Sequence, residues 1–535
     1  MIRSFTGAAA LALLAGLSGT ANAETTLVIL HTNDFHSRIE PINGFDSTCG
    51  GKDAAEGKCF GGSARLETAI RERKAAHPDA LLVDGGDQFQ GSLFYTYYKG
   101  KAAAELMNTL GYDAMTVGNH EFDDGPEVLR GFMDAVAFPV LLANADVSKE
   151  PALADVLKPS TVIEKGGVRY GLIGLTPGDA AELASPGKNI TFSDPEPALE
   201  AEIARLKDDG IEHVVVLSHS GYAVDQRIAA AVAGIDVIIG GHSHTYLSNT
   251  SDEAEGPYPT FVEGPDGTKV PIVQAGSYGK FLGELTVTFD DSGTVTGAVG
   301  EPVLMDASIA EDETIKARVA ELAVPLEEIR SKVVAETAAP IDGGRDTCRA
   351  QECEMGNLVA DAMLAHVAGQ GVTIAIQNGG GVRASIDAGE VTMGEVLTVL
   401  PFQNTLATFG LKGSDVIAAL ENGVSQVEEG AGRFPQVAGL KYTWTPSAAP
   451  GTGRIKEVLV KGEGDAWSPI DPEKTYLLVT NNYMRTGGDG YAVFAEKAVD
   501  AYDFGPNLED VVAAYMSAST TPYQPRVDGR ITRVE

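Results

Sequence analysis

GNHEFD (residues 118–123) directly follows AMTV (114–117), a short apolar run of the kind that forms a buried strand. The stretch places an amide, an imidazole and two carboxylates within five positions, at Asn119, His120, Glu121 and Asp123. By itself it fits two interpretations: an ordinary polar loop after a strand, or a metal site in which Asn119 is a ligand. The rest of the chain decides between them.

Four further segments show the same order, an apolar run and then a turn rich in metal-ligand residues. They are HTNDFH (31–36), DGGDQFQG (84–91), SHSG (218–221) and GGHSH (240–244). Helical patterns at 64–76 and 197–210 lie between such runs. Strands that alternate with helices predict an α/β fold with buried sheets in layers. Because loops beyond the carboxyl ends of these strands lie together, the five segments are expected to converge.

Histidine usage favours a metal centre. The chain has nine histidines, and six lie in these motifs: His31, His36, His120, His219, His242 and His244. A single histidine of this kind is more often structural, but five motifs of one type reverse that balance. Ligands of the Asp, His and Asn types suit zinc, manganese, iron or cobalt rather than calcium. Alternate spacing supports chelation by Asp34 with His36 and by His242 with His244, and DGGDQ offers a bridging carboxylate.

The length and composition of the chain limit the possible number of domains and the possible classes of partner. A chain of 535 residues is too long for one hydrophobic core, so two or more domains are expected. The net charge of −35 argues against nucleic-acid polymers and against anionic membrane surfaces as partners. An anionic substrate would enter against this field, so it requires a strong local cation.

Residues 1–23 show the charged, apolar, A-x-A order of a cleaved signal peptide, with Ala21-Asn22-Ala23 at the cut. The alternative is a membrane anchor, but the apolar run around 8–17 is too short to span a bilayer. A periplasmic or secreted protein is therefore expected, and the short signal suggests a bacterial periplasm. In an oxidising compartment the close pairs Cys49/Cys59 and Cys348/Cys353 favour two local disulfides, with a structural zinc site as the alternative.

The second half of the chain begins after a predicted connector. Apolar residues recur at helical spacing from Ile315 to Val333, which predicts one long amphipathic helix over 312–337 with a kink at Pro325. We expect residues 24–310 to form one domain, 311–337 a linker helix or hinge, and 338–535 a second, smaller α/β domain. In that domain a helix is predicted at 354–368 and a strand at 372–377.

Taken in order, the motifs resemble those of the calcineurin-like binuclear metallophosphoesterases, and the HTNDFH, DGGDQFQG and GNHEFD forms resemble the 5′-nucleotidase family. The resemblance covers nearly the whole mature chain. It implies a layered α/β catalytic domain and a C-terminal substrate domain. It further implies two divalent ions, zinc first with manganese or cobalt as alternatives. The first ion would be held by Asp34, His36, Asp87 and His244; the second by Asp87, Asn119, His219 and His242.

The resemblance also assigns His120 and Asp123 to a catalytic dyad. Asp123 follows His120 by three positions, near enough across one turn to orient the ring and stabilise its cation. The implied chemistry is attack by metal-activated water, with no phosphoenzyme; a histidine or aspartate phosphoryl acceptor is the alternative. His31 is expected to be structural, and Glu121 receives no role.

In the second half the resemblance implies a nucleotide site. Guanidinium groups suit phosphate because they donate paired hydrogen bonds, and they supply the local cation that the acidic chain requires. Two aromatic rings would hold the base and an aspartate the ribose. The family often carries Phe where this chain has Tyr483, which keeps stacking but puts base or sugar preference in doubt. The implied residues are Arg345, Arg349, Asn378, Arg383, Phe402, Tyr483 and Asp489.

The expected function is release of phosphate from nucleoside 5′-monophosphates, with cleavage of UDP-sugars or other nucleotides in the same site. Three alternatives stay open. Within the same superfamily, the chain could instead hydrolyse 2′,3′-cyclic nucleotides or 3′-nucleotides, or it could hydrolyse sulfur-linked esters. The third alternative, from another class, is a two-lobed exported protein that binds nucleotides for transport without turnover. The oligomeric state is expected to be a monomer or a homodimer. Closure of the two domains over the substrate is expected at the linker.

Overall fold

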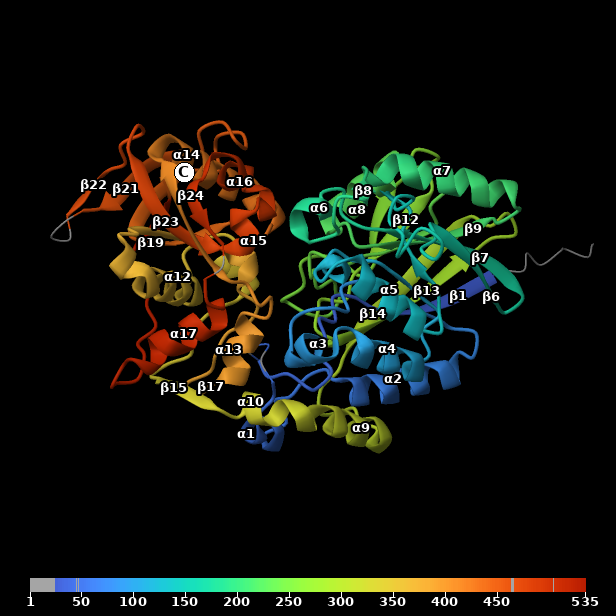
Figure 1. Cartoon of the computed structure of the whole chain (residues 1–535). Coiled ribbons are helices and arrows are strands. Elements are labelled where there is room, and N and C mark those ends of the chain that lie inside the picture. The colour runs from blue at the N-terminus through green and yellow to red at the C-terminus, as the bar shows by residue number, and fades with distance from the viewer. Residues whose placement is uncertain (1–24, 45, 47, 463–465, 504) are drawn as a thin grey trace, which may run out of the picture.

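In the computed structural model two α/β domains lie side by side (Figure 1). The structure describes residues 25–44, 46, 48–462, 466–503 and 505–535. The predicted signal peptide, residues 1–23, lies outside this part of the chain. Among the described residues, none of the helices combines the length and the apolar character needed to cross a membrane.

Two six-stranded sheets form the centre of the N-terminal domain. The first has the order β14-β13-β1-β2-β3-β4 and the second β11-β12-β10-β9-β7-β6. The strands of the first sheet are β1 (Thr25–Thr32), β2 (Leu81–Asp84), β3 (Ala114–Thr116), β4 (Val140–Leu141), β13 (Phe281–Phe289) and β14 (Val295–Leu304). Those of the second are β6 (Ser160–Lys165), β7 (Val168–Leu175), β9 (His213–Ser218), β10 (Val237–Ile239), β11 (Thr260–Glu263) and β12 (Lys269–Val273). A short ribbon pairs β5 (Ala145–Asp146) with β8 (Thr191–Phe192).

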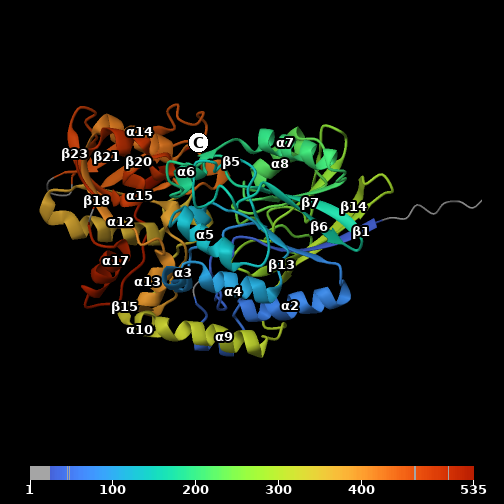
Figure 2. The same ribbon diagram turned by 45° about the vertical axis from the view of Figure 1, so that its right-hand side comes forward.

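Side chains that alternate along each strand pack on both faces of the sheets and so form the layers of the domain. Ile29 of β1 points into the core between the two sheets, whereas its neighbour Leu30 faces the helix-covered side. Leu81 and Leu82 of β2 divide in the same way. The helices of this domain are α1 (Gly51–Ala55), α2 (Ser63–Ala76), α3 (Leu93–Tyr98), α4 (Lys101–Leu110), α5 (Pro126–Ala135), α6 (Ala180–Leu183), α7 (Pro195–Asp208) and α8 (Tyr222–Ala231). Helices α2, α4 and α5 cover the first sheet, and α7 and α8 cover the second (Figure 2).

Parallel pairing brings the predicted turns together. In the first sheet β1, β2, β3 and β4 run parallel, and in the second β7, β9, β10 and β12 do. Thr32 at the end of β1 is level with Asp84 at the end of β2. The five motif turns therefore leave their sheets at the same edge, as the alternation of strands and helices predicted.

The connector differs from the prediction of one helix over 311–337. Helix α9 (Glu313–Ala323) passes through a turn at Val324–Leu326, where Pro325 lies, into α10 (Glu327–Arg330). Residues Val333–Thr337 form strand β15, which pairs with β17 (Gly389–Thr392) in the C-terminal domain. The spacing of the apolar residues suggested a longer helix than the one that forms. The last two residues of that apolar series, Ile329 and Val333, are 46% and 50% exposed and so do not belong to a buried helix face. The helix thus ends before residue 333, and its buried face packs on the N-terminal core.

The C-terminal domain is built on a five-stranded sheet of order β19-β16-β23-β18-β24 and a four-stranded sheet of order β22-β21-β20-β25. Their strands are β16 (Ile374–Asn378), β18 (Leu406–Lys412), β19 (Pro435–Ala438), β20 (Leu440–Trp444), β21 (Ile455–Lys461), β22 (Trp467–Pro469), β23 (Thr475–Asn481), β24 (Val499–Tyr502) and β25 (Ile531–Arg533). The helices are α11 (Arg345–Cys348), α12 (Glu354–Val367), α13 (Met393–Val399), α14 (Gly413–Gly423), α15 (Asn482–Arg485), α16 (Ala492–Lys497) and α17 (Leu508–Ser517). The two-domain α/β class predicted from the sequence is confirmed.

Both predicted disulfides are present, Cys49–Cys59 and Cys348–Cys353. The structural zinc alternative is therefore wrong for these cysteines. The second bridge closes the short loop between the end of α11 and the start of α12. Arg349 lies inside this loop and Arg345 at the start of α11, and both are predicted substrate residues.

Candidate active site

Backbone strain is concentrated where the five turns meet. Non-glycine residues seldom adopt the left-handed conformation, which costs on the order of 1–3 kcal/mol. Five predicted metal ligands have it: Asp34 (φ 50°), His36 (φ 50°), Asp87 (φ 58°), His242 (φ 71°) and His244 (φ 59°). Such clustering is typical of functional sites, because surrounding contacts must hold each strained residue in place.

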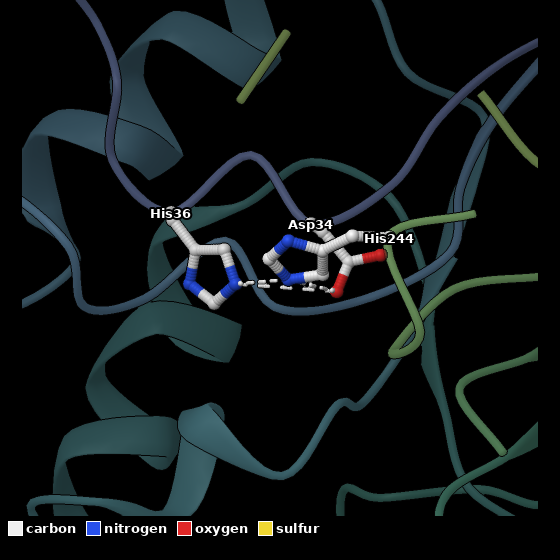
Figure 3. Close-up of side chains that lie close together, drawn as sticks. All are labelled: Asp34, His36 and His244. Atoms are coloured by element: carbon white, nitrogen blue, oxygen red, sulfur yellow. Dashed lines mark hydrogen bonds and ion pairs between the residues drawn. The ribbon is translucent and has the colours of Figure 1, made fainter. Parts of the chain in front are cut away.

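Asp34, His36 and His244 form one group (Figure 3). Asp34 Oδ1 lies 3.3 Å from His244 Nε2 and 3.9 Å from His36 Nε2. The two Nε2 atoms are 3.2 Å apart. The other oxygen of Asp34 is engaged, because Oδ2 accepts hydrogen bonds from His242 N and Asn33 Nδ2, each at 2.9 Å. One carboxylate oxygen and two imidazole nitrogens thus converge on one point.

Asp87 connects this group to a second one, which it forms with His219 and His242. Its Oδ2 atom lies 3.0 Å from His219 Nε2 and 3.8 Å from His36 Nε2, between the two groups. His242 Nδ1 lies 2.9 Å from Asn119 Oδ1. This is the place at which a carboxylate shared by two metal ions is required.

The protonation of the histidines fits bound cations. His219 Nδ1 lies 2.7 Å from the Gly85 carbonyl oxygen, and His36 Nδ1 lies 3.1 Å from that of Phe89. A carbonyl accepts, so each Nδ1 carries a proton and each Nε2 is the ring atom left to face a cation. The buried Nε2 of His219 has no hydrogen-bond partner and faces the Asp87 carboxylate. Burial alone would lower the pKa of His219, but the Asp87 and Asp34 carboxylates outweigh it and raise the pKa to about 10, so in the metal-free protein a proton lies between this nitrogen and Asp87. A metal ion can take the place of that proton, so these residues fit a dinuclear metal site.

His120 and Asp123 form the predicted pair. His120 Nδ1 lies 2.7 Å from Asp123 Oδ2, and His120 Nε2 points toward Asp87 Oδ2 at 3.9 Å. Burial alone would lower the pKa of His120, but the carboxylates of Asp123 and Asp87 outweigh it and raise the pKa above its ordinary value. The ring is held in one orientation, with Nε2 toward the metal groups.

Three arginines of the C-terminal domain line a cavity of about 430 Å³ beside the metal groups. Arg383 Nη2 donates to His36 Nε2 at 3.0 Å, and Arg345 Nη2 donates to the His242 carbonyl oxygen at 3.3 Å. Burial, together with the charges of Arg345 and Arg383, lowers the pKa of Arg349 well below its ordinary value. Three guanidinium groups held together in this way create a strong attraction for an anion.

Another part of the same cavity is lined by aromatic and amide side chains. The Phe402 ring stacks on the His120 ring, with centroids 5.5 Å apart, and lies 5.7 Å from the Arg383 guanidinium carbon. Asn378 Nδ2 donates to Asp489 Oδ2 at 2.7 Å, and the Tyr483 hydroxyl oxygen accepts from Asp489 N at 3.1 Å. All the predicted substrate-binding residues line this cavity, which they share with residues of the metal groups and the dyad: Arg345, Arg349, Asn378, Arg383, Phe402, Tyr483 and Asp489.

Sequence reasoning missed several contributors. The ring of Tyr278 packs against His36 and His244, with centroids 5.7 Å and 5.3 Å away, but no motif surrounds it. The segment 177–185 supplies cavity residues from the catalytic domain, including Pro177 and Leu183. His31 is buried and lies 2.9 Å from the Tyr258 hydroxyl, outside the metal groups, in agreement with a structural role.

The fold and the convergent Asp, His and Asn side chains define a class, that of two-domain metallophosphoesterases. A calcineurin-like phosphoesterase family model matches residues 27–246, and a model of the 5′-nucleotidase C-terminal domain matches residues 333–496. The first match covers all five motif turns. The second covers the arginines and aromatic residues of the cavity.

Relatives of known name narrow the class. The 5′-nucleotidase of Bos taurus is 37% identical over 524 residues, which covers 94% of this chain and 90% of that protein. A snake venom 5′-nucleotidase of Naja atra is 38% identical over 489 residues, covering 87% of this chain and 91% of that protein. The structure of a 5′-nucleotidase precursor from Thermus thermophilus aligns with a TM-score of 0.90 at 40% identity, over 95% and 99% of the two chains.

The chain therefore belongs to the 5′-nucleotidase family, in which a calcineurin-like phosphoesterase domain is joined to a 5′-nucleotidase C-terminal domain. The resemblance drawn from the motifs is confirmed, as is the enzyme class, a phosphoric monoester hydrolase with a dinuclear metal site.

Proposed function

We propose that this protein releases phosphate from nucleoside 5′-monophosphates. One observation carries the proposal: a single cavity joins the metal groups and His120 to three arginines and to the Phe402, Tyr483 and Asp489 side. A phosphate between the arginines and the metal groups would leave its nucleoside in the aromatic part. A simple phosphomonoester without a base would make no use of that part.

Two divalent ions would complete the site. Zinc is the preferred assignment, with manganese or cobalt as alternatives. Asp34, His36, Asp87 and His244 would hold one ion; Asp87, Asn119, His219 and His242 would hold the other. When bound, the ions supply an activated water and neutralise phosphoryl charge. Softer sulfur ligands are absent from the described site, and the mixed imidazole and carboxylate set suits each of these metals.

The side chains of the protein would bind and orient the phosphate, and His120 would hold a proton beside it. His120, held by Asp123, presents a charged Nε2–H where the phosphoryl and leaving oxygens would lie, and so stabilises the transition state. The arginines bind the non-bridging oxygens by paired hydrogen bonds. Phe402 and Tyr483 would stack on the base, and stacking of this kind tolerates several bases. Asp489 would accept hydrogen bonds from the ribose hydroxyls.

Domain movement would let substrate in and product out. The linker would be the hinge, between a catalytic domain at 24–310 and a nucleotide domain from 338 onward. The present arrangement is closed, because Arg383 of one domain touches His36 of the other and Tyr483 touches Glu182. Opening must break these contacts, and closure must form them around the substrate.

The protein would act outside the cytoplasm, in a periplasm or after secretion, as a monomer or homodimer. The two disulfides support this location, because such bridges persist in oxidising compartments. Export would proceed through the predicted signal peptide.

A phosphate-release screen tests the proposal. The mature protein, stripped of metal and reloaded with zinc, manganese or cobalt, is given AMP, UMP, UDP-glucose, 2′,3′-cyclic nucleotides, 3′-AMP and a sulfur-linked ester. Hydrolysis of the 5′-monophosphates at the highest kcat/KM supports it. Preference for the cyclic, 3′ or sulfur-linked compounds would favour the alternative hydrolases, and nucleotide binding without turnover would favour a transport protein.

A further inference from the structure

Glu121, the third residue of the NHEFD run, has a buried carboxylate that the proposed chemistry does not use. The residue is 0% exposed and lies in a single helical turn, His120–Phe122, directly after the ligand Asn119. Burying an ionised carboxylate is costly unless hydrogen bonds satisfy it. Its partners therefore show what it does.

Four backbone N–H groups donate to this one carboxylate. Oε1 accepts from Gln88 N at 2.8 Å and from Phe89 N at 3.1 Å. Oε2 accepts from Asp87 N at 3.0 Å and from Gly118 N at 2.7 Å. Three consecutive N–H groups that point at one anion form a backbone nest, here filled by a side chain of the same domain. An ionised carboxylate has about four acceptor positions, so this set saturates it.

The four bonds join two ligand-bearing turns. Asp87 belongs to the turn after β2, whereas Gly118, Asn119 and His120 belong to the turn after β3. The turns approach closely through their backbones: a Cβ placed on Gly118 would lie 2.6 Å from Asp87 N. Asp87 Oδ1 also accepts from His120 N at 2.9 Å. The position of Asp87 relative to Asn119 and His120 is thus fixed by Glu121 and by close backbone contact.

We propose that Glu121 is a positioning residue that sets the spacing of the Asp87 and Asn119 ligands by filling the nest at residues 87–89. Asp87 has a left-handed backbone, φ 58°, which the three N–H bonds of its turn hold in place. Asp87 lies between the two metal groups, so a shift of its turn disturbs the second metal group and the approach of His120 together. Glu121 touches neither metal ligand atom nor substrate, and it acts through Asp87.

Acid-to-amide exchange tests the proposal with little change in shape. Glu121→Gln puts an NH₂ group, a donor, against two backbone N–H donors, and so breaks the nest. Glu121→Asp keeps the charge but shortens the side chain by one methylene group. The matched control is Asp236→Asn, which removes another buried carboxylate that caps a backbone N–H, that of Val214 at 2.7 Å, away from the metal groups.

Metal binding is the first readout. Calorimetric titration of the metal-free proteins with Mn²⁺ should give two equivalents for the wild type and for Asp236→Asn. In Glu121→Gln, affinity for the second equivalent should fall by about 10- to 100-fold, the usual cost of losing a partner that orients a ligand. The affinity of Glu121→Asp for the second equivalent should lie between those of the wild type and Glu121→Gln. Wild-type affinity for both equivalents in either Glu121 variant, or equal loss in the control, would overturn the proposal.

Kinetics give the second readout, which rests on the proposed nucleotidase function. At saturating Mn²⁺ the kcat of Glu121→Gln for AMP should fall by about 10- to 100-fold, while KM changes little because the arginines and aromatic residues are untouched. A loss that scales only with thermal stability, shared by Asp236→Asn, would indicate a merely structural role. If the wild type hydrolyses no nucleotide, the proposed function fails, and the metal titration still decides the role of Glu121.

Discussion

The hydroxyl of Tyr483, in the C-terminal domain, donates a 2.7 Å hydrogen bond to the backbone carbonyl of Glu182, in the N-terminal domain. The same side chain lines the cavity, and its hydroxyl oxygen accepts a hydrogen bond from Asp489 N. One residue therefore links the aromatic part of the cavity to the closed arrangement of the domains. Arg433 adds to this contact from nearby, with Nη2 3.9 Å from Glu182 and 4.0 Å from Asp179.

Tyr483→Phe separates stacking from the polar contacts of the hydroxyl. The ring is kept, while the bonds of the hydroxyl to Glu182 and to Asp489 N are lost, each of which costs about 0.5–1.5 kcal/mol. The KM for AMP should rise by roughly 2- to 12-fold. Tyr483→Ala also removes the ring and should cost more, about 1–3 kcal/mol in stacking. Steady-state kinetics of both variants check this order; a smaller defect in Tyr483→Ala than in Tyr483→Phe would contradict it.

His120→Ala should separate metal binding from turnover. The imidazole lies beside the metal groups but is held by Asp123, so its loss should leave metal content unchanged and lower kcat by about 10²- to 10⁴-fold. Asn119→Ala provides the comparison, because it removes an oxygen beside His242 and should weaken binding of one ion. Elemental analysis and AMP kinetics on both proteins check the division. Loss of metal from His120→Ala would contradict it.

Arg349→Met should weaken substrate binding. The change keeps a long side chain but removes one of three guanidinium groups at the cavity, so the KM for AMP should rise about 10-fold or more with a smaller change in kcat. Arg169→Gln, an exposed arginine in β7, is the control and should have wild-type kinetics. The competitive inhibition constant of inorganic phosphate, measured on both variants, should move with KM. Equal inhibition by phosphate in Arg349→Met and the wild type would show that Arg349 does not bind the phosphate.

Metal removal should lower stability as well as activity. Without metal ions, the buried Asp34 and Asp87 carboxylates lose the cations that offset their mutual repulsion. The chelated protein should unfold at a lower temperature than the manganese-loaded protein, and manganese or cobalt, but not calcium, should restore both properties. Thermal unfolding with and without chelator measures this. An unchanged midpoint would argue against a buried metal centre.

Asp236 should make stability depend on pH. Burial raises the pKa of Asp236 to about 7, whereas an unfolded aspartate has a pKa of about 3.9. The folded state thus binds this proton more tightly, and the contribution to stability, complete below about pH 4, is lost as pH rises through about 7. Asp236→Asn should flatten the profile of unfolding free energy between these limits. Urea unfolding across that range measures it, and an unchanged slope would contradict the assignment.

Much of the site could be predicted from the sequence because strand alternation and ligand types leave local patterns. The turns that carry Asp34, Asp87 and His242 were each preceded by an apolar run that became a parallel strand, which was enough to predict their convergence. The helix at 354–368 formed as α12 for the same reason, with its apolar face buried.

The remainder depended on contacts that leave no pattern. Glu121 accepts from N–H groups about 30 residues earlier in the chain, and nothing in the sequence marks those donors. The Tyr483–Glu182 bond joins two domains. The linker was predicted too long because a strand residue, Val333, happened to fall in phase with the helical spacing, and only pairing of β15 with β17 distinguishes the two.

The central claim, that two ions at the Asp87-centred site drive hydrolysis of 5′-mononucleotides, is tested most directly by stepwise reloading. Metal-free protein is titrated with Mn²⁺ while phosphate release from AMP is recorded. Little release is expected up to one equivalent, followed by a steep rise as the second ion binds, and Asp87→Asn should be inactive throughout. Full activity at one equivalent, or no release from any 5′-mononucleotide with manganese, zinc or cobalt, would contradict it.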